Sequence, residues 1–185
     1  MEIPVVVQHR HVHLCEHDAQ ILFGTDNLTS SRMIDQRDQY IFSRKVSLHG
    51  SKGSFEDVCV IGPVRDQTQV EISSSDAYAI GLLAPLRVSG DLERSGTVLL
   101  KTDLGEIRAK SSTIIPMRHL HLPLSLAEEL GLSHHDTVSL TLKEYPEIVF
   151  DHVVIRIHPA FLPAFHLTKD EAASEWIQTG DHVIL

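Results

Sequence analysis

The feature that most constrains the fold of this chain is an internal repeat built on paired histidines. The five-residue word Arg-His-x-His-Leu occurs at residues 10–14 and returns at residues 118–122. Two histidines at positions i and i+2 of a β-strand point to the same face, because side chains alternate across a strand. Imidazoles placed in this way can bind one metal ion together. The repeat therefore predicts two related strands that each carry a potential metal-binding pair.

The repeat continues beyond the histidines and has four copies. In each copy an alanine stands six positions after a metal-capable residue, as Ala19 after His13, Ala77 after Glu71, Ala127 after His121 and Ala172 after His166. The pattern predicts a strand, a turn and a short helix. The expected helix N-caps are Asp18, Ser75 or Asp76, Ser125, and Thr168 or Asp170. Gly24, Gly81 and Gly131 are expected C-caps. Three copies then continue into short apolar strands at 86–88, 137–140 and 182–185.

Four like units related by pseudo-symmetry would bring equivalent positions together. The residues expected to converge are His11, His13, Glu71, His119, His121 and His166. Six ligands are too many for one four-coordinate zinc ion, but they suit two metal ions with open positions. An open position is typical of a catalytic metal site. The alternative is that each histidine lies half-buried on a short strand without binding metal.

Composition sets the class of protein. The 185 residues, 42% hydrophobic and 22% charged, are typical of one globular domain or two small ones. The sequence contains no run of about 18 apolar residues, so it predicts no membrane-spanning helix. The net charge of −9 argues against a nucleic-acid partner. Cys15 and Cys59 are too few for a disulfide framework, which favours a reducing cytoplasm.

The secondary structure is predicted to be mostly β. Apolar or alternating stretches predict strands at 3–8, 41–48, 57–62, 97–101, 113–116, 137–143 and 148–157. Turn residues at 51–53, 89–91 and 103–105 separate some of these strands. The expected helices are few and short, which argues against a Rossmann or TIM-barrel fold. The pattern favours small β-barrels with helical caps, and the polar stretch 25–39 is typical of an inserted excursion.

Arg65 lies four residues before Gln69 and six before Glu71. An arginine beside a metal site offers a phosphate group a permanently charged, bidentate partner. The alternative role for Arg65 is a surface ion pair. Ser89 follows a strand at a glycine turn and could donate a hydrogen bond to phosphate, although turn formation alone would also explain it.

Five segments together resemble the PduL-type phosphate acyltransferases (phosphate propanoyltransferases). They are RHVHL at 10–14, GPVRDQTQVEIS at 62–73, APLRVSGD at 84–91, RHLHL at 118–122, and the His166 segment before the last helix. The resemblance covers nearly the whole chain and implies two β-barrels that exchange segments. Residues 1–8 and 117–185 are expected to form the first barrel. Residues 9–22 and 44–116 are expected to form the second, with 23–43 as the excursion.

The resemblance also implies a ligand set. His11, His13 and Glu71 would bind one zinc ion, nearer the thiol of coenzyme A, while His119, His121 and His166 would bind a second. Other divalent metals are possible in both places. Arg65 matches the arginine that the family uses for phosphate, and Gln69 and Ser89 fall at catalytic positions. The remaining positions beside coenzyme A or phosphate are Arg10, Gln36, Gln39 and Arg156.

The implied activity is reversible transfer of an acetyl or propanoyl group between coenzyme A and orthophosphate, by direct attack of phosphate on the thioester. The implied partners are acyl-CoA and phosphate, and the implied assembly is a homodimer. The chain starts at its first strand, so targeting to a bacterial microcompartment is not expected. The alternatives are another metal-dependent β-barrel enzyme, cupin-like or a thioesterase, and a metal-binding module without enzymatic activity.

Overall fold

The computed structural model describes residues 1–25, 28–34 and 39–185 and divides the chain into two compact units. Unit 1 comprises Met1–Gln8 and Met117–Leu185, and unit 2 comprises His9–Pro116. Each unit has its own core of buried apolar side chains. No helix of the described residues is both long and apolar enough to cross a membrane.

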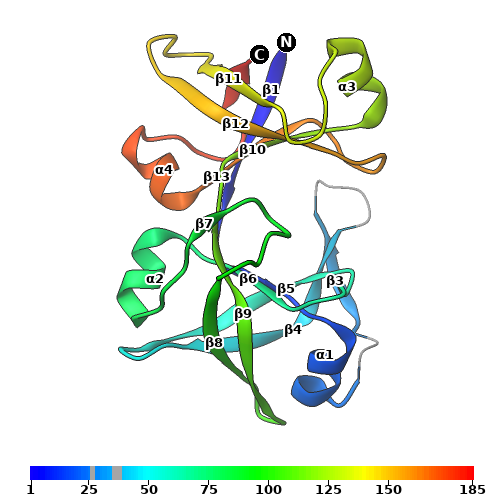
Figure 1. Cartoon of the computed structure of the whole chain (residues 1–185), viewed down its shortest axis with the longest axis vertical. Helices are drawn as coiled ribbons and strands as arrows, with labels where there is room; N and C mark the ends of the chain where they lie inside the picture. The colour runs from blue at the N-terminus through cyan, green and yellow to red at the C-terminus, as the bar shows by residue number, and fades with distance from the viewer. Residues whose placement is uncertain (26–27, 35–38) are drawn as a thin grey trace. The chain divides into compact units, whose positions relative to one another are not determined.

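Unit 1 is a closed barrel of six strands (Figure 1). Going round the barrel, the strands are β1 (Glu2–Gln8), β13 (Ala164–Thr168), β10 (His119–Leu122), β12 (Val149–Ile157), β11 (Thr137–Leu142) and β14 (His182–Ile184). The core includes Leu120, Ile155 and Phe165, none of which is exposed to solvent. Burying such side chains contributes about 1.5–3 kcal/mol each.

Unit 2 contains a second ring of six strands. Going round the ring, the strands are β9 (Glu106–Pro116), β6 (Gln69–Glu71), β2 (His11–His13), β5 (Ser54–Gly62), β4 (Tyr40–His49) and β8 (Gly96–Lys101). The ring closes because β8 pairs with both β4 and β9. Two short strands, β3 (Ser30–Met33) and β7 (Leu86–Arg87), pair with β4 and β9 outside the ring. The prediction of two small β-barrels is confirmed.

The two barrels have the same topology. Each histidine-pair strand, β2 or β10, lies between a parallel neighbour and an antiparallel one. All six pairings round one ring match those of the other in direction. The halves of the chain exchange one strand, because β1 completes unit 1 but leads into β2, and β9 completes unit 2 but leads into β10. The sequence repeat is therefore a duplicated barrel with a reciprocal strand exchange.

The match extends to an irregularity of the strands. The pairing of β4 with β5 shifts register between Val46 and Leu48, and the pairing of β11 with β12 shifts between Val138 and Leu140. Asp57 on β5 and His152 on β12 are 95 residues apart and have the same left-handed backbone, with φ values of 57° and 58°. A bulge bends a strand and increases its twist, which helps a short strand follow a small barrel.

The four predicted helices are present, one after each repeat of the strand motif. They are α1 (Glu16–Phe23), α2 (Ser74–Ile80), α3 (Leu124–Leu130) and α4 (Lys169–Ser174). The predicted C-caps are confirmed, because Gly24, Gly81 and Gly131 each end a helix in the left-handed conformation. The repeat-defining alanines, Ala19, Ala77, Ala127 and Ala172, are all buried.

The predicted N-caps are wrong for three helices. The caps are Cys15, Ser73 and Pro123, two or three residues earlier than expected, whereas Thr168 was among the predicted alternatives. Each cap residue stands two positions after a strand's last metal-capable residue, and the helix begins at the next residue. Neither Cys15 nor Pro123 makes a side-chain capping bond. A side-chain capping bond therefore does not fix the start of α1 or α3, whereas Ser73 does cap α2.

The segment 23–43 is not purely an excursion. Ser30–Met33 forms β3 along the edge of β4, and β4 itself begins at Tyr40. The equivalent stretch of the second repeat is much shorter, because Gly131 and Val138 are separated by six residues and Gly24 and Val46 by twenty-one. Extra residues at this point therefore distinguish the first repeat from the second.

We expect the unit 1 core to tolerate truncation poorly. Leu140 on β11 has no exposed surface, so Leu140→Ala should lower the free energy of unfolding by about 2–5 kcal/mol. Leu124→Ala is the matched control, because Leu124 is 48% exposed and its loss should change stability by less than about 0.5 kcal/mol. Urea denaturation followed by circular dichroism measures both. Equal effects of the two substitutions would contradict this placement of the core.

Candidate metal centre

The pairing of β2 with β6 places three metal-capable side chains together in unit 2. The two strands are antiparallel, with His11 opposite Glu71 and His13 opposite Gln69. Val12 and Val70, between these positions, are completely buried in the core. The alternation of a strand therefore turns both histidines to the face that Glu71 also occupies.

Backbone carbonyls fix the orientation of both imidazoles. His11 Nδ1 lies 2.9 Å from the carbonyl oxygen of His9, and His13 Nδ1 lies 3.0 Å from that of Ile61 on β5. A carbonyl only accepts hydrogen bonds, so each Nδ1 carries the proton and donates it. In a neutral ring oriented in this way, Nε2 presents a lone pair. Metal-binding histidines are commonly oriented by a second hydrogen bond of this kind.

Glu71 is held by a buried network of polar side chains. Its Oε1 accepts hydrogen bonds from Gln69 Nε2 at 2.6 Å and from Ser89 Oγ at 2.7 Å. Gln69 is fixed in turn, because its Oε1 accepts a hydrogen bond from the backbone N–H of Gly90 at 2.9 Å. The other carboxylate oxygen, Oε2, lies 3.4 Å from His11 Nε2. Gln69 and Ser89 thus aim one oxygen of Glu71 towards the histidines.

The electrostatics favour an ionised Glu71. Burial raises the pKa of this carboxyl, but its electrostatic interactions with His11, His13 and Arg65, together with the hydrogen bond from Ser89, outweigh burial and lower the pKa from 4.5 to about 2. Burial, followed by the charge of Arg65, holds the pKa of His13 well below 6.5. Near neutral pH the site therefore combines a carboxylate with a neutral imidazole, the protonation states that bind metals.

Arg65 reaches the same place from the loop between β5 and β6. Its Nη2 donates a hydrogen bond to His13 Nε2 at 2.9 Å, and its backbone N–H donates to the carbonyl of Leu14 at 2.9 Å. The second contact joins the loop to the end of β2. The guanidinium therefore takes the lone pair of His13 that a bound metal ion would take.

His11, His13 and Glu71 fit a divalent metal ion. Their ligand atoms all lie within 4.8 Å of one another, and all three residues are buried. Two imidazoles and one carboxylate are a known ligand set of catalytic zinc, in which a fourth position stays open. Within residues 1–25, 28–34 and 39–185, no other group of three His, Cys, Asp or Glu residues has its ligand atoms so close.

Unit 1 contains a related set of three histidines. The pairing of β10 with β13 places His119 opposite His166, as His11 stands opposite Glu71 in unit 2. His119 Nδ1 lies 2.8 Å from the carbonyl oxygen of Met117, two residues earlier, as in His11. The ring centroids of His119, His121 and His166 are 4.3–5.0 Å apart. Their rings cluster, but their ligand atoms do not form a compact group like that of unit 2.

His121 is buried against an aromatic ring. Its ring stacks on Phe161 with centroids 3.8 Å apart, and its buried Nδ1 has no hydrogen-bond partner among the described residues. Burial, followed by the charges of His166 and His119, holds its pKa well below 6.5. The ring is therefore neutral and has a nitrogen available for a ligand.

Comparison with known proteins identifies the family. The phosphate propanoyltransferase family model matches residues 4–178. A phosphate propanoyltransferase of Shewanella putrefaciens is 39% identical over 182 residues, covering 98% of this chain and 86% of its own length. The Thermotoga maritima enzyme of the same name is 38% identical over 185 residues, covering 99% and 88%. The chain belongs to the phosphate propanoyltransferase family. An Escherichia fergusonii member is 36% identical over 171 residues, covering 92% and 81%.

The site residues that the family resemblance predicts lie in both units. The structure brings the six predicted ligands together as two sets of three, one set in each barrel. Arg156 stands opposite His121 in the pairing of β10 with β12. Gln39 immediately precedes β4, and its carbonyl accepts a hydrogen bond from the N–H of Ile34 at 3.3 Å. Gln36 lies outside the described residues. Arg10 contacts Asp76 and Phe55.

Some residues that shape the site escaped sequence reasoning. The carbonyls of His9 and Ile61 orient the imidazoles, but any residue type offers a carbonyl, so the sequence carries no signal for them. For Phe55 and Asp76, which contact Arg10, the sequence did contain a signal. Phe150 and Glu171 stand 95 residues after them, the offset that also relates Glu71 to His166.

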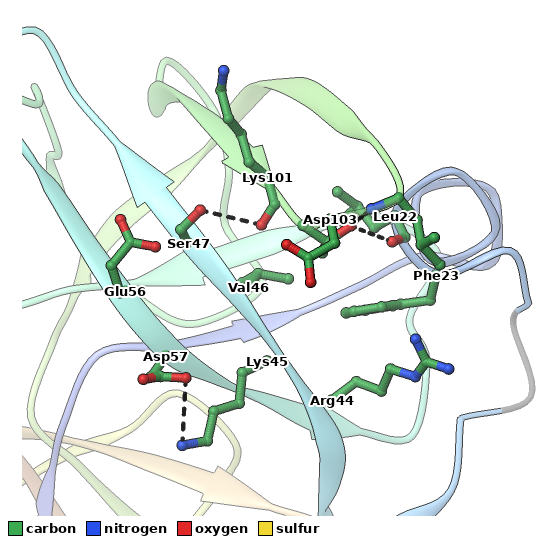
Figure 2. A pocket seen from close by; sticks show the side chains of 12 residues that line it. Leu22, Phe23, Arg44, Lys45, Val46, Ser47, Glu56, Asp57, Lys101 and Asp103 are labelled. Atoms are coloured by element: carbon green, nitrogen blue, oxygen red, sulfur yellow. Dashed lines mark hydrogen bonds and ion pairs between the residues drawn. The ribbon is translucent and has the colours of Figure 1, made fainter.

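A groove elsewhere in unit 2 contains none of the predicted site residues (Figure 2). Its volume is about 460 Å³. Two lysines and one arginine line it together with three acidic residues, and Lys45 Nζ lies 3.9 Å from Asp57 Oδ1. Opposite charges that offset one another give the groove no preference for an anionic ligand, so it does not compete with the histidine site.

We expect Ser89 to support metal binding through Glu71. Ser89→Ala removes one of the two hydrogen bonds to Oε1 and should weaken zinc binding about 10- to 100-fold, the usual effect of losing a partner of a metal ligand. Ser95→Ala is the control, because Ser95 Oγ is buried without a hydrogen-bond partner in the described structure. Competition with a zinc-binding dye measures both affinities. An unchanged affinity in Ser89→Ala would show that the network does not hold Glu71.

Proposed function

We propose that this protein is a phosphate acyltransferase that moves a short acyl group, acetyl or propanoyl, reversibly between coenzyme A and orthophosphate. The observation that carries the proposal is the contact of Arg65 with His13 beside Glu71, in a chain whose family match spans residues 4–178. The contact places a permanent cation at a candidate metal centre. Both kinds of positive charge stabilise an oxyanion substrate.

We propose that His11, His13 and Glu71 hold one zinc ion, and that His119, His121 and His166 hold another. Another divalent metal could take either place. When bound, such an ion supplies a Lewis acid that stabilises a thiolate leaving group or an oxyanion. The neutral imidazole of His13 and the ionised carboxylate of Glu71 support this assignment. The second set is supported by the matching pairing of His119 with His166.

Arg65 is the proposed phosphate-binding residue. Its hydrogen bond to His13 uses the lone pair that a metal ion would need, so binding of a metal would deprive Nη2 of this acceptor. The guanidinium would then lie beside a second positive charge. An anion that contacts both would remove that repulsion, and a phosphate matches the planar fork of an arginine. Phosphate and the metal site are thereby coupled through one side chain.

The hydroxyl and thiol nearest this site in the described part of the chain, Ser89 and Cys15, are not set up as activated nucleophiles. Ser89 Oγ donates a hydrogen bond to Glu71 Oε1, so the hydroxyl proton is engaged by the carboxylate. Cys15 Sγ lies 3.6 Å from Thr68 Oγ1, whose one proton is donated to Asp18 Oδ2, so neither group acts as a base for the thiol. We therefore propose direct attack: a phosphate oxygen bonds to the thioester carbonyl carbon, the carbon–sulfur bond breaks, and acyl phosphate and coenzyme A thiolate are formed.

The remaining assignments rest on the family resemblance. We propose that Arg156, Gln36 and Gln39 lie beside coenzyme A or phosphate and that the working form is a homodimer. Gln69 and Ser89 would support catalysis by holding Glu71 in place. We also place the reaction in the cytoplasm, where acyl-CoA and phosphate occur and where the free cysteines Cys15 and Cys59 would stay reduced.

The activity itself gives the first test. With acetyl-CoA or propanoyl-CoA, free thiol should appear only when phosphate is present, and acyl phosphate should form in equal amount. A thiol-reactive dye and a hydroxamate assay for acyl phosphate measure the two products. His13→Ala should abolish turnover, because it removes a metal ligand and the acceptor of Arg65. Thiol release at the same rate without phosphate would indicate a thioesterase, and no release from either substrate would favour a non-enzymatic module.

Arg65 gives a sharper test of the phosphate site. A hydrogen bond to a charged group contributes about 1.5–3 kcal/mol, so Arg65→Ala should raise the KM for phosphate about 10- to 100-fold. The KM for acyl-CoA should change much less. Arg65→Lys should restore only part of the loss, because an ammonium lacks the planar fork. Steady-state kinetics with phosphate and acyl-CoA varied in turn measure the split. Normal kinetics with phosphate in Arg65→Ala would refute the assignment.

A further inference from the structure

Arg10, at the start of the repeated word, is engaged with two other residues of unit 2. Its Nη1 lies 2.9 Å from Asp76 Oδ2, and the side chain of Asp76 is only 5% exposed. Its guanidinium carbon lies 3.8 Å from the centre of the Phe55 ring, a close cation–π contact. The ion pair and the aromatic contact together hold the guanidinium in one place.

The same three-residue arrangement occurs in unit 1. Arg118 Nη1 lies 3.8 Å from Glu171 Oε1, and the Arg118 guanidinium carbon lies 5.8 Å from the centre of the Phe150 ring. The positions are equivalent in the two repeats. Each acidic residue stands five positions after the third ligand of its set, Glu71 or His166. Each phenylalanine stands four positions before the strand partner of the first histidine, because His11 pairs with Cys59 and His119 pairs with Val154. Both barrels thus retain an arginine, a phenylalanine and an acid.

Each partner of Arg10 belongs to an element that places part of the metal-binding set. Arg10 directly precedes His11 on β2. Phe55 lies on β5, the strand whose Ile61 carbonyl orients His13. Asp76 lies in the first turn of α2, which begins after the cap residue Ser73, two positions beyond Glu71. A single side chain therefore joins the three segments that fix His11, His13 and Glu71.

We propose that Arg10, Phe55 and Asp76 form a tie that positions the first metal-binding set, and that Arg118, Phe150 and Glu171 do the same for the second. This inference rests on the proposed function only in requiring that the two sets bind metal. It gives Arg10 a positioning role in place of contact with coenzyme A, because its guanidinium is already bound on one edge and covered on one face. The tie in unit 2 is the stronger, because its ion pair is shorter and less exposed.

The affinity for zinc tests the tie directly. Arg10→Gln and Asp76→Asn should each weaken zinc binding at the first set about 10- to 100-fold, as loss of a support for a metal ligand commonly does. Asp76→Glu should bind zinc nearly as well as the parent protein, because the second repeat has Glu171 at the equivalent position. Zinc affinity is measured on the full chain by competition with a chelator. With Co²⁺ as a spectroscopic probe, Arg10→Gln should also change the visible absorption bands of the site, which a general loss of stability would not do.

Arg44→Gln is the matched control. Arg44 also lies over a phenylalanine of unit 2, with its guanidinium carbon 5.8 Å from the centre of the Phe23 ring, but it is on β4, which carries no ligand (Figure 2). Its zinc affinity and Co²⁺ spectrum should equal those of the parent protein. An Arg10→Gln protein that matches Arg44→Gln in both measurements would overturn the tie and leave the proposed function intact. An Asp76→Glu protein as weak as Asp76→Asn would also overturn it. A parent protein that binds no zinc would refute both proposals.

Discussion

The placement of the site depends on a backbone interaction, the antiparallel pairing of each histidine-pair strand with the strand that carries the third ligand. This pairing sets His11 opposite Glu71 and His119 opposite His166. A shift of one residue would turn the histidines into the core and expose Val12 or Leu120 instead. Both apolar residues have no exposed surface, so the core enforces the register. Hydrophobic burial and ligand geometry are thus fixed by the same alternation, and neither can change alone.

Duplication explains the remaining organisation. Each barrel is completed by the first strand of the other repeat, which is why unit 1 contains the N-terminal strand β1 and the C-terminal third of the chain. The repeats keep the bulge at Asp57 and His152, the buried alanines of the helices, and the arginine before each histidine pair. The two repeats differ in the third metal-binding residue and in the residue that supports it. Glu71 corresponds to His166, and Gln69, which holds Glu71 through a hydrogen bond, corresponds to Ala164. The carboxylate and its polar network therefore belong to the first repeat alone.

Much of this arrangement could be predicted from the sequence, because alternation and turn chemistry are local. The histidine pairs, the closing glycines and most strands follow from residues close together in the chain. The helix starts did not follow, because Cys15 and Pro123 cap their helices without a side-chain bond, and a rule based on capping side chains points to later residues. The role of Arg10 also did not follow. It depends on contacts with Phe55 and Asp76, 45 and 66 positions away, and only an alignment of the two repeats relates these residues to Phe150 and Glu171.

The central claim is that His11, His13 and Glu71 bind a metal ion beside Arg65. The most direct measurement is a crystallographic anomalous difference map recorded on both sides of the zinc absorption edge, with crystals of protein purified without chelators. The account predicts a zinc peak within about 2.0–2.2 Å of His11 Nε2, His13 Nε2 and a carboxylate oxygen of Glu71, the usual bond lengths for these ligands. The Arg65 guanidinium should then no longer contact His13 Nε2. A map with no peak at these three residues, in crystals of active protein, would contradict the account.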